Sequence, residues 1–124
     1  MRVLMLSWEY PPHVVGGLGK HVAELVPALA RRQVDVHLIT PAHGSEAGTE
    51  IIDGITVHRV ASTQGAFPDF YTEAVHTNHA LQRHAERIIT QLGSFDLIHN
   101  HDWLTSFAAQ EIKHTYKLPL LATI

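Results

Sequence analysis

The stretch Ser-Trp-Glu-Tyr-Pro-Pro-His-Val-Val-Gly-Gly-Leu-Gly-Lys, residues 7–20, constrains the fold of this chain more than any other. It follows an apolar run that predicts a strand buried on both faces, Val3–Ser7. It precedes apolar residues at helical spacing, which predict a helix over Gly17–Arg32. A strand, a glycine-rich loop and a helix in this order can place the helix N-terminus at the end of a parallel sheet.

The glycines in this loop suit an anion or a polyol ligand. Unpaired N–H groups at a helix N-terminus attract negative charge, and glycines let a ligand approach the backbone because they carry no Cβ. Glu9, in a loop stiffened by Pro11-Pro12, adds a charged side chain beside them. An alternative is that the glycines only allow close packing of helix on strand. The Gly16-Gly17-x-Gly19 spacing is not the dinucleotide fingerprint, which argues against a nucleotide-dependent oxidoreductase.

The remaining sequence predicts alternating strands and helices. The Asp53-Gly54 pair between apolar runs predicts a hairpin, and one of its arms should join the main sheet. The predicted elements are a strand over Val34–Thr40, the hairpin over Glu50–Val60 with Ile55–Val60 in the sheet, a helix from Asp69 to Leu92 stopped by Gly93, a strand over Asp96–His99, a helix over Trp103–Tyr116, and a strand over Leu118–Ile124. This alternation predicts an α/β fold, a parallel sheet with helices on both faces.

Composition narrows the function classes. The 124 residues are enough for one domain, and the net charge of −3 with scattered Lys and Arg argues against nucleic acid as a partner. The absence of cysteine excludes disulfides and thiolate chemistry and fits the cytoplasm best. No apolar run approaches the ~20 residues of a membrane span, and none matches a signal peptide. We therefore expect a soluble cytoplasmic protein without an integral membrane segment.

A second candidate site follows the strand predicted to end at His99. Ligands of open α/β sheets bind beyond the carboxyl ends of the strands, where the winding direction reverses. If this strand and the first are neighbours, His99-Asn100-His101-Asp102-Trp103 shares a cleft with the glycine loop. His101 is the candidate for a hydrogen bond to a sugar hydroxyl or a leaving-group oxygen. Asp102 has an alternative role as helix N-cap, and Trp103 one in packing.

Histidine is abundant, with 11 in the chain. His76 and His79 are three residues apart on a predicted helix, and His84 follows, which raises the question of a metal site. No carboxylate or fourth ligand stands at matching spacing, so we predict no metal centre. The simpler interpretation is a set of surface and loop histidines without a shared role.

The two motifs together resemble a known family. Glu9-Tyr10-Pro11-Pro12, then Gly16-Gly17-Leu18-Gly19-Lys20-His21-Val22, then His99-Asn100-His101-Asp102-Trp103 is similar to the N-terminal domain of retaining GT-B glycosyltransferases, in particular glycogen synthase-like and family-4 members. The resemblance covers the whole chain. It implies that residues 1–124 are the acceptor-side, Rossmann-like N-terminal half of a GT-B fold, incomplete at its end and without the C-terminal nucleotide-sugar-binding domain.

The resemblance also implies a reaction. Such enzymes move a sugar, here expected to be a hexose such as glucose, from a nucleotide-sugar to a sugar or glucan acceptor with retention of configuration. It implies substrate-binding roles for Glu9, Gly16, Gly17, Leu18 and Asp102, and a catalytic and substrate-binding role for His101. It implies no cofactor and no metal, since the UDP- or ADP-sugar donor is held mainly by the other domain.

Two departures from the family pattern qualify these expectations. Val14 stands where bacterial glycogen and starch synthases carry lysine, which weakens an ADP-glucose-specific interpretation. Without the C-terminal domain, the chain by itself is expected to be inactive, and its last strand to be a route to a homodimer. The alternative function is a non-catalytic sugar- or phosphate-binding or self-associating module derived from such a domain.

Overall fold

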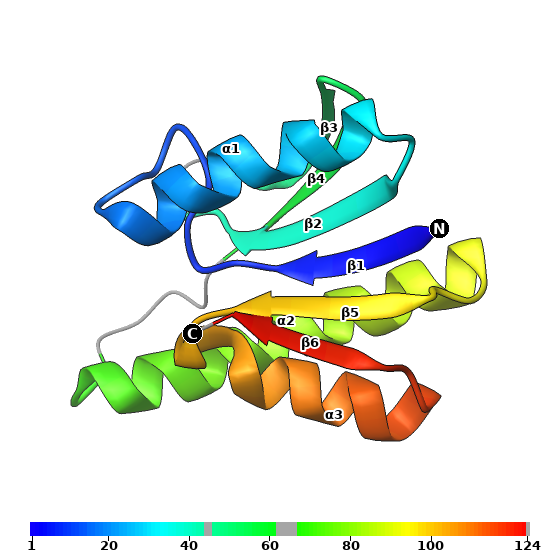
Figure 1. The fold of residues 1–124 in the computed structure, drawn as a ribbon. Coiled ribbons are helices and arrows are strands. Elements are labelled where there is room, and N and C mark those ends of the chain that lie inside the picture. The colour runs from blue at the N-terminus through cyan, green and yellow to red at the C-terminus, as the bar shows by residue number, and fades with distance from the viewer. Residues whose placement is uncertain (44–45, 62–66, 124) are drawn as a thin grey trace.

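The chain folds into a six-stranded sheet covered by helices (Figure 1). This is a computed structural model, and it describes residues 1–43, 46–61 and 67–123. In chain order the elements are β1 (Arg2–Leu6), α1 (Gly17–Arg31), β2 (Asp35–Pro41), β3 (Gly48–Ile52), β4 (Ile55–Val60), α2 (Phe70–Leu92), β5 (Leu97–His101), a short 3₁₀ helix η1 (Trp103–Thr105), α3 (Ser106–Tyr116) and β6 (Leu120–Thr123).

The strand order is β3-β4-β2-β1-β5-β6, and only the β3–β4 pair is antiparallel. Both arms of the hairpin therefore join the sheet, with β4 parallel to β2. The hairpin turn is the one that the Asp-Gly pair predicts, since Asp53 and Gly54 have φ values of 51° and 82°. The prediction of a parallel sheet with an added hairpin is confirmed.

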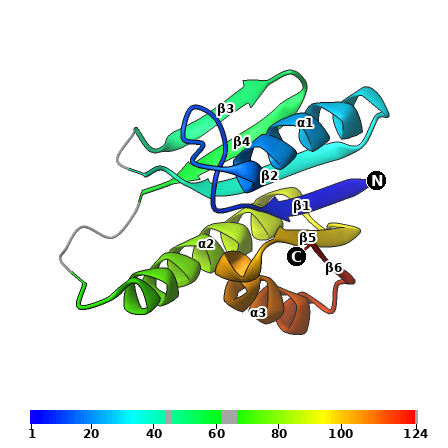
Figure 2. The ribbon, with the colours of Figure 1, turned by 60° about the vertical axis from the view of Figure 1, so that its left-hand side comes forward.

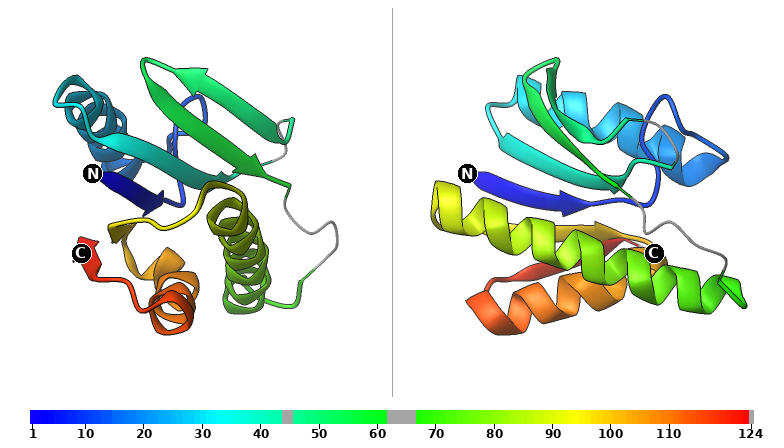
Figure 3. Two further views of the ribbon diagram at one scale, coloured as in Figure 1. Left: turned by 90° about the vertical axis from the view of Figure 1, so that its right-hand side faces the viewer. Right: turned by 180° about the vertical axis from the view of Figure 1, so that it is seen from behind.

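Helices cover both faces of the sheet, with α1 on one face and α2 and α3 on the other (Figures 2 and 3). Alternation along β1 explains this arrangement, because successive strand residues point to opposite faces. Leu4 and Leu6 pack in the core with α2 and α3, whereas Met5 packs in the core with α1. The unbroken apolarity of this strand is therefore the signature of burial on both faces, as predicted.

The segment after β5 differs from its prediction. Instead of one helix over Trp103–Tyr116, the 3₁₀ turn η1 comes first and α3 begins only at Ser106. Asp102 therefore caps η1, while Thr105 precedes α3 without a side-chain cap. The predicted strand Asp96–His99 also extends to His101, which makes this histidine the last residue of β5.

The last strand, β6, is shorter than predicted, and Ile124 lies outside the described residues. Within the part of the chain that the structure describes, β6 pairs with β5 alone, and Leu121 is 49% exposed. Among these residues, no helix combines the length and the apolarity that a membrane crossing requires.

Candidate functional site

The two sequence motifs meet because β1 and β5 are neighbours. They pair in parallel with Leu6 opposite Asn100, so their carboxyl ends lie side by side (Figure 1). From β1 the chain winds through β2 to β4, and β5 and β6 then add on the opposite side. The junction of β1 and β5 is therefore the topological switch point, the place where open α/β sheets bind ligands.

Glu9 stabilises the glycine loop from inside. Its Oε1 accepts hydrogen bonds from the N–H groups of Val15, at 3.1 Å, and Gly16, at 3.5 Å. A carboxylate at this position complements the partial positive charge near the start of α1. These bonds give the Glu9 side chain a structural role in shaping the loop, and its contact with a substrate stays a prediction.

The three glycines of the loop divide into two kinds. A Cβ on Gly19 would lie 2.7 Å from Glu9 Oε1 and 3.0 Å from Val14 Cγ1, so this glycine is required for packing. A Cβ on Gly16 or Gly17 would meet nothing within 4 Å among the described residues, and both positions are exposed. The close-packing interpretation therefore holds for Gly19 alone, and the other two glycines leave the backbone open to a partner from outside.

Leu18 has a different environment from its neighbours. It is half-buried, and its side chain packs against the core on the α1 face of the sheet. A contribution of Leu18 to ligand binding would therefore come from its backbone, whose N–H lies in the first turn of α1.

His101 is the unusual residue of the site. Its side chain is 0% exposed, yet neither ring nitrogen has a hydrogen-bond partner within the described residues. A buried polar group without a partner costs about 1–3 kcal/mol, so burial of these two ring nitrogens lowers the stability of the fold. Burial, with smaller effects of His99 and His21, lowers the pKa of His101 to about 4. The imidazole is therefore neutral at pH 7, with one donor and one acceptor nitrogen.

Two further histidines surround His101. The ring of His99 lies 4.2 Å from it between centroids, and its Nε2 is 2.7 Å from Thr123 Oγ1. The ring of His21 lies edge-on at 5.6 Å. His21 is exposed and belongs to the second turn of α1. Because α1 begins at the glycine loop, the ring contact of His21 connects this loop to His101. Sequence reasoning did not single out His21, although its place four residues after Gly17 puts it one turn into a helix that starts at the site.

The residues after His101 turn the chain sharply. Asp102 has φ 70° and ψ 166°, a region almost restricted to glycine, which costs about 1–3 kcal/mol. Two hydrogen bonds hold the turn. Asn100 Nδ2 donates to the Asp102 carbonyl at 3.0 Å, and the Trp103 N–H donates to the Asp102 carboxylate. The alternative prediction, that Trp103 packs in the core, is wrong, because this residue is 54% exposed.

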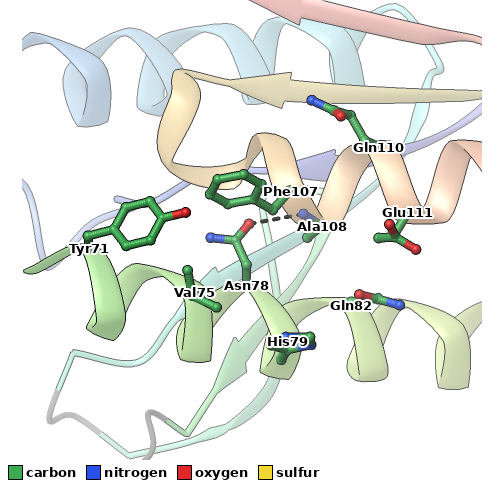
Figure 4. Close-up of a pocket in the computed structure, with 9 residues that line it drawn as sticks. All are labelled: Tyr71, Val75, Asn78, His79, Gln82, Phe107, Ala108, Gln110 and Glu111. Atoms are coloured by element: carbon green, nitrogen blue, oxygen red, sulfur yellow. Dashed lines mark hydrogen bonds between the residues drawn. The ribbon is translucent and has the colours of Figure 1, made fainter. Parts of the chain in front are cut away.

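A separate hollow of about 490 Å³ lies between α2 and α3 (Figure 4). Its lining includes Tyr71, Phe107 and Asn78, whose Oδ1 accepts a hydrogen bond from the Ala108 N–H at 3.0 Å. None of the residues predicted for the site lines this hollow. Across the described ranges, no group of three or more His, Asp or Glu side chains is arranged to hold a metal ion.

Comparison with known proteins decides the family. The family profile described as the starch synthase catalytic domain matches residues 2–124. The chain belongs to this family. It is 35% identical over 138 aligned residues to a glycogen synthase of Mycobacterium tuberculosis, covering 100% of this chain and 33% of that protein. It is 33% identical over 124 residues to an uncharacterized glycosyltransferase of Methanocaldococcus jannaschii, covering 100% of this chain and 30% of that protein.

Solved structures agree with this assignment. The catalytic domain of starch synthase IV from Arabidopsis thaliana, solved with ADP and acarbose bound, matches with a TM-score of 0.70 and 25% identity over 92% of this chain and 30% of that one. The fold of this starch synthase-family chain thus resembles the Rossmann-like N-terminal domain of GT-B glycosyltransferases, as its motifs indicate. The chain spans about a third of the length of the curated relatives it matches.

Proposed function

We propose that residues 1–124 form the N-terminal, acceptor-side half of the active site of a retaining glycosyltransferase. The reaction is transfer of a hexose such as glucose from a UDP- or ADP-sugar to a sugar or glucan acceptor. The observation that carries this proposal is that His101, buried without a hydrogen-bond partner among the described residues, and two exposed glycines follow neighbouring strands at the switch point of the sheet. The identity to a glycogen synthase and the likeness to a starch synthase solved with ADP and acarbose support it.

Each part of the site has a role in this proposal. Gly16 and Gly17 let the donor diphosphate approach the start of α1, where N–H groups stabilise the negative charge that develops on the leaving group. His101, neutral at pH 7, donates to or accepts from a hydroxyl of the transferred sugar. Trp103 offers an exposed indole to the acceptor, since aromatic rings provide apolar faces on which a sugar can stack.

Access to His101 requires one change in the site. Because its side chain has no exposed surface, a substrate reaches it only after neighbouring side chains move, and His21, whose ring lies 5.6 Å away, is one of these neighbours. His21 is exposed and on the first half of a helix, so its side chain can change rotamer without unfolding of α1. The second wall of the cleft, with most of the nucleotide contacts, is supplied by a C-terminal domain, and no cofactor or metal ion takes part.

Binding to the 124-residue chain tests the proposal directly. We would follow amide resonances by ¹H–¹⁵N NMR while adding ADP, UDP, ADP-glucose, UDP-glucose or short maltooligosaccharides. The expected result is saturable shifts confined to residues 15–21 and 99–103, lost in His101→Asn and kept in the exposed control His114→Asn. Equal binding by His101→Asn, or shifts that map elsewhere, would contradict the proposed site.

A second measurement tests whether the chain acts alone. Incubation of the chain with a labelled nucleotide-sugar and an acceptor is expected to give no transfer, because half of the cleft is missing. Measurable transfer of the labelled sugar would contradict the proposal that a second domain supplies part of the active site. Binding of an acceptor without any nucleotide contact would favour the alternative of a non-catalytic sugar-binding module.

A further inference from the structure

A second hollow, of about 430 Å³, lies between α2 and the β3–β4 hairpin. It is built from elements other than those that carry His101 and the glycine loop. Figure 3 shows α2 running across the face of the sheet opposite α1. Its volume is within the range of small-molecule sites. Its lining includes Thr49 and Arg59 of the hairpin and Ala80, Arg83, His84 and Arg87 of α2.

One face of α2 supplies the cationic wall. Ala80, Arg83, His84 and Arg87 follow at intervals of three, one and three residues, so they share a single side of the helix. Two arginines four residues apart repel each other and weaken a helix slightly. Ala80 leaves space between this wall and the hairpin, because its side chain is a single methyl group.

No carboxylate neutralises these arginines. Within the described residues, neither Arg83 nor Arg87 forms an ion pair, and no Asp or Glu lines the hollow. Glu86, next to both on α2, accepts a hydrogen bond from Gln82 at 3.1 Å. The sequence of residues 44–45, 62–66 and 124 contains no acidic residue either. The hollow is therefore a concentration of positive charge on a chain whose net charge is −3.

The third arginine in the lining is already occupied. The Arg59 Nε donates to Glu50 Oε1 at 3.0 Å, and its guanidinium also donates to the Pro11 carbonyl. In contrast, Thr49 and His84 are polar groups held in place by one neighbour. His84 Nε2 and Thr49 Oγ1 lie 3.4 and 3.2 Å from Nδ1 of the buried His58. Among the described residues His84 Nδ1 has no hydrogen-bond partner, and the contact of Nε2 with His58 fixes the ring at the edge of the hollow.

We propose that this hollow binds the phosphate group of a small phosphate monoester, between Arg83 and Arg87. Guanidinium groups match the oxygens of a phosphate with paired N–H donors, and such charge-assisted bonds are the strong ones. His84 and Thr49, both held by His58, line the hollow beside the arginines, and the remaining volume accepts the organic part of the ligand. The site goes beyond the proposed transferase function, since it shares no residue with the His101 site.

The test is an NMR titration of the 124-residue chain with inorganic phosphate, at an ionic strength held constant with sodium chloride. The expected result is saturable shifts at Thr49, Ala80, Arg83, His84 and Arg87. Arg83→Gln and Arg87→Gln should each weaken binding by about tenfold or more, because each removes a charge-assisted contact. Arg31→Gln, at the exposed end of α1 on the other face of the sheet, is the matched control and should bind as the unmodified chain does.

Three outcomes would overturn the proposal. They are shifts that rise linearly without saturation, shifts confined to residues 15–21, and unchanged affinity in an Arg83→Gln, Arg87→Gln double variant that keeps its dispersed spectrum. Ribose 5-phosphate should bind more tightly than inorganic phosphate, and equal affinity would contradict a monoester. Nucleotide-sugar binding at residues 15–21 and 99–103 is followed in a separate titration of the same chain, so failure of either site is seen independently of the other.

Discussion

Gly17 and Gly19 lie two residues apart on α1 and have opposite reasons to be glycine. The space around Gly17 is open, whereas a Cβ on Gly19 would collide with Glu9. Only at Gly17 can a side chain be added without disturbing the fold. Packing within the described residues explains the glycine at position 19, whereas at position 17 it leaves room for a side chain.

We predict that Gly17→Ala raises the stability of the chain by about 0.5–1 kcal/mol, because alanine loses less backbone entropy in a helix. The same variant should lose nucleotide-sugar binding. Gly19→Ala should lower stability by about 1–3 kcal/mol through overpacking against Glu9. Urea denaturation checks both, and a Gly17→Ala variant that binds ligand normally would contradict the role given to this glycine.

Asp102 is the residue with the most strained backbone at the site. Its φ of 70° and ψ of 166° place it where glycine is nearly the only residue found. Strain of this kind persists where surrounding contacts impose it, and here the Asp102 N–H donates to the Thr123 carbonyl at 2.8 Å. The strained residue directly follows His101, so the sharp turn ends β5 at the residue proposed to contact substrate.

We predict that Asp102→Gly is more stable than Asp102→Ala by about 1–2 kcal/mol. Both variants lose the capping carboxylate, but only glycine relieves the backbone strain. At Glu111, in the middle of α3, the order should reverse, with alanine favoured over glycine by about 1 kcal/mol. Chemical denaturation of the four variants checks this, and the same order at both sites would rule out strain at Asp102.

At the scale of elements, histidines from β2, β4 and α2 connect the sheet to its helix. His37 Nδ1 lies 3.2 Å from His58 Nε2, and His84 Nε2 lies 3.4 Å from His58 Nδ1. If each ring is protonated on Nε2, every Nε2–H donates to the next group, and the chain ends on the Asp35 carboxylate 3.5 Å from His37. One tautomer thus satisfies three neutral histidines in a row.

This arrangement makes stability depend on pH. Burial lowers the pKa of His37 and of His84, and burial with the neighbouring His84 and His37 lowers the pKa of His58 to about 4. The unfolded chain takes up protons below about pH 6.5, whereas the folded chain resists them. Stability is therefore complete above about pH 6.5 and is lost as the pH falls toward 4.

We predict that the free energy of unfolding, measured by urea denaturation, falls by about 2 kcal/mol or more between about pH 7 and pH 5. Each histidine contributes up to about 1.4 kcal/mol per pH unit to this decrease. His58→Gln removes one of these groups and should flatten the slope by about one proton. The exposed His114→Gln is the control and should keep the slope of the unmodified chain. An unchanged slope in His58→Gln would show that the buried histidines do not cause the acid sensitivity.

At the scale of the whole molecule, the β6 side of the sheet is open among the described residues. β6 pairs only with β5 there, and Leu121 is about half exposed. An unpaired strand edge with apolar surface is a template for pairing with another chain. The opposite edge strand, β3, also carries an exposed apolar residue, Ile51, and differs by its charged Glu50, which pairs with Arg59.

We predict that the 124-residue chain self-associates, with a homodimer through β6 as the first species. Leu121→Lys should shift the equilibrium to monomer, because a charge on an edge strand opposes pairing. Leu92→Lys, at an exposed leucine that ends α2, is the control and should leave association unchanged. Size-exclusion chromatography with light scattering checks this, and a monomer at every concentration would count against the β6 edge as an interface.

The sequence by itself determined the elements of this protein and the two motifs that matter. Periodicity and turn chemistry are local properties, so the strand Val3–Ser7, the Asp53-Gly54 hairpin and the cap of α2 at Asp69 could be predicted within a few residues. Local rules failed at Asp102, where they predicted an ordinary helix start. A backbone held in a strained conformation by a distant strand has no local signature.

Only the tertiary structure decided which residues form a site. Val3 pairs with Leu97, more than ninety residues away, and this pairing follows from the direction in which the chain winds. It brings His21 against His101 and buries His101 without a partner. The same holds for the cationic face of α2. Helical spacing places Arg83 and Arg87 on one side of the helix, but the hollow forms only because α2 packs against the hairpin.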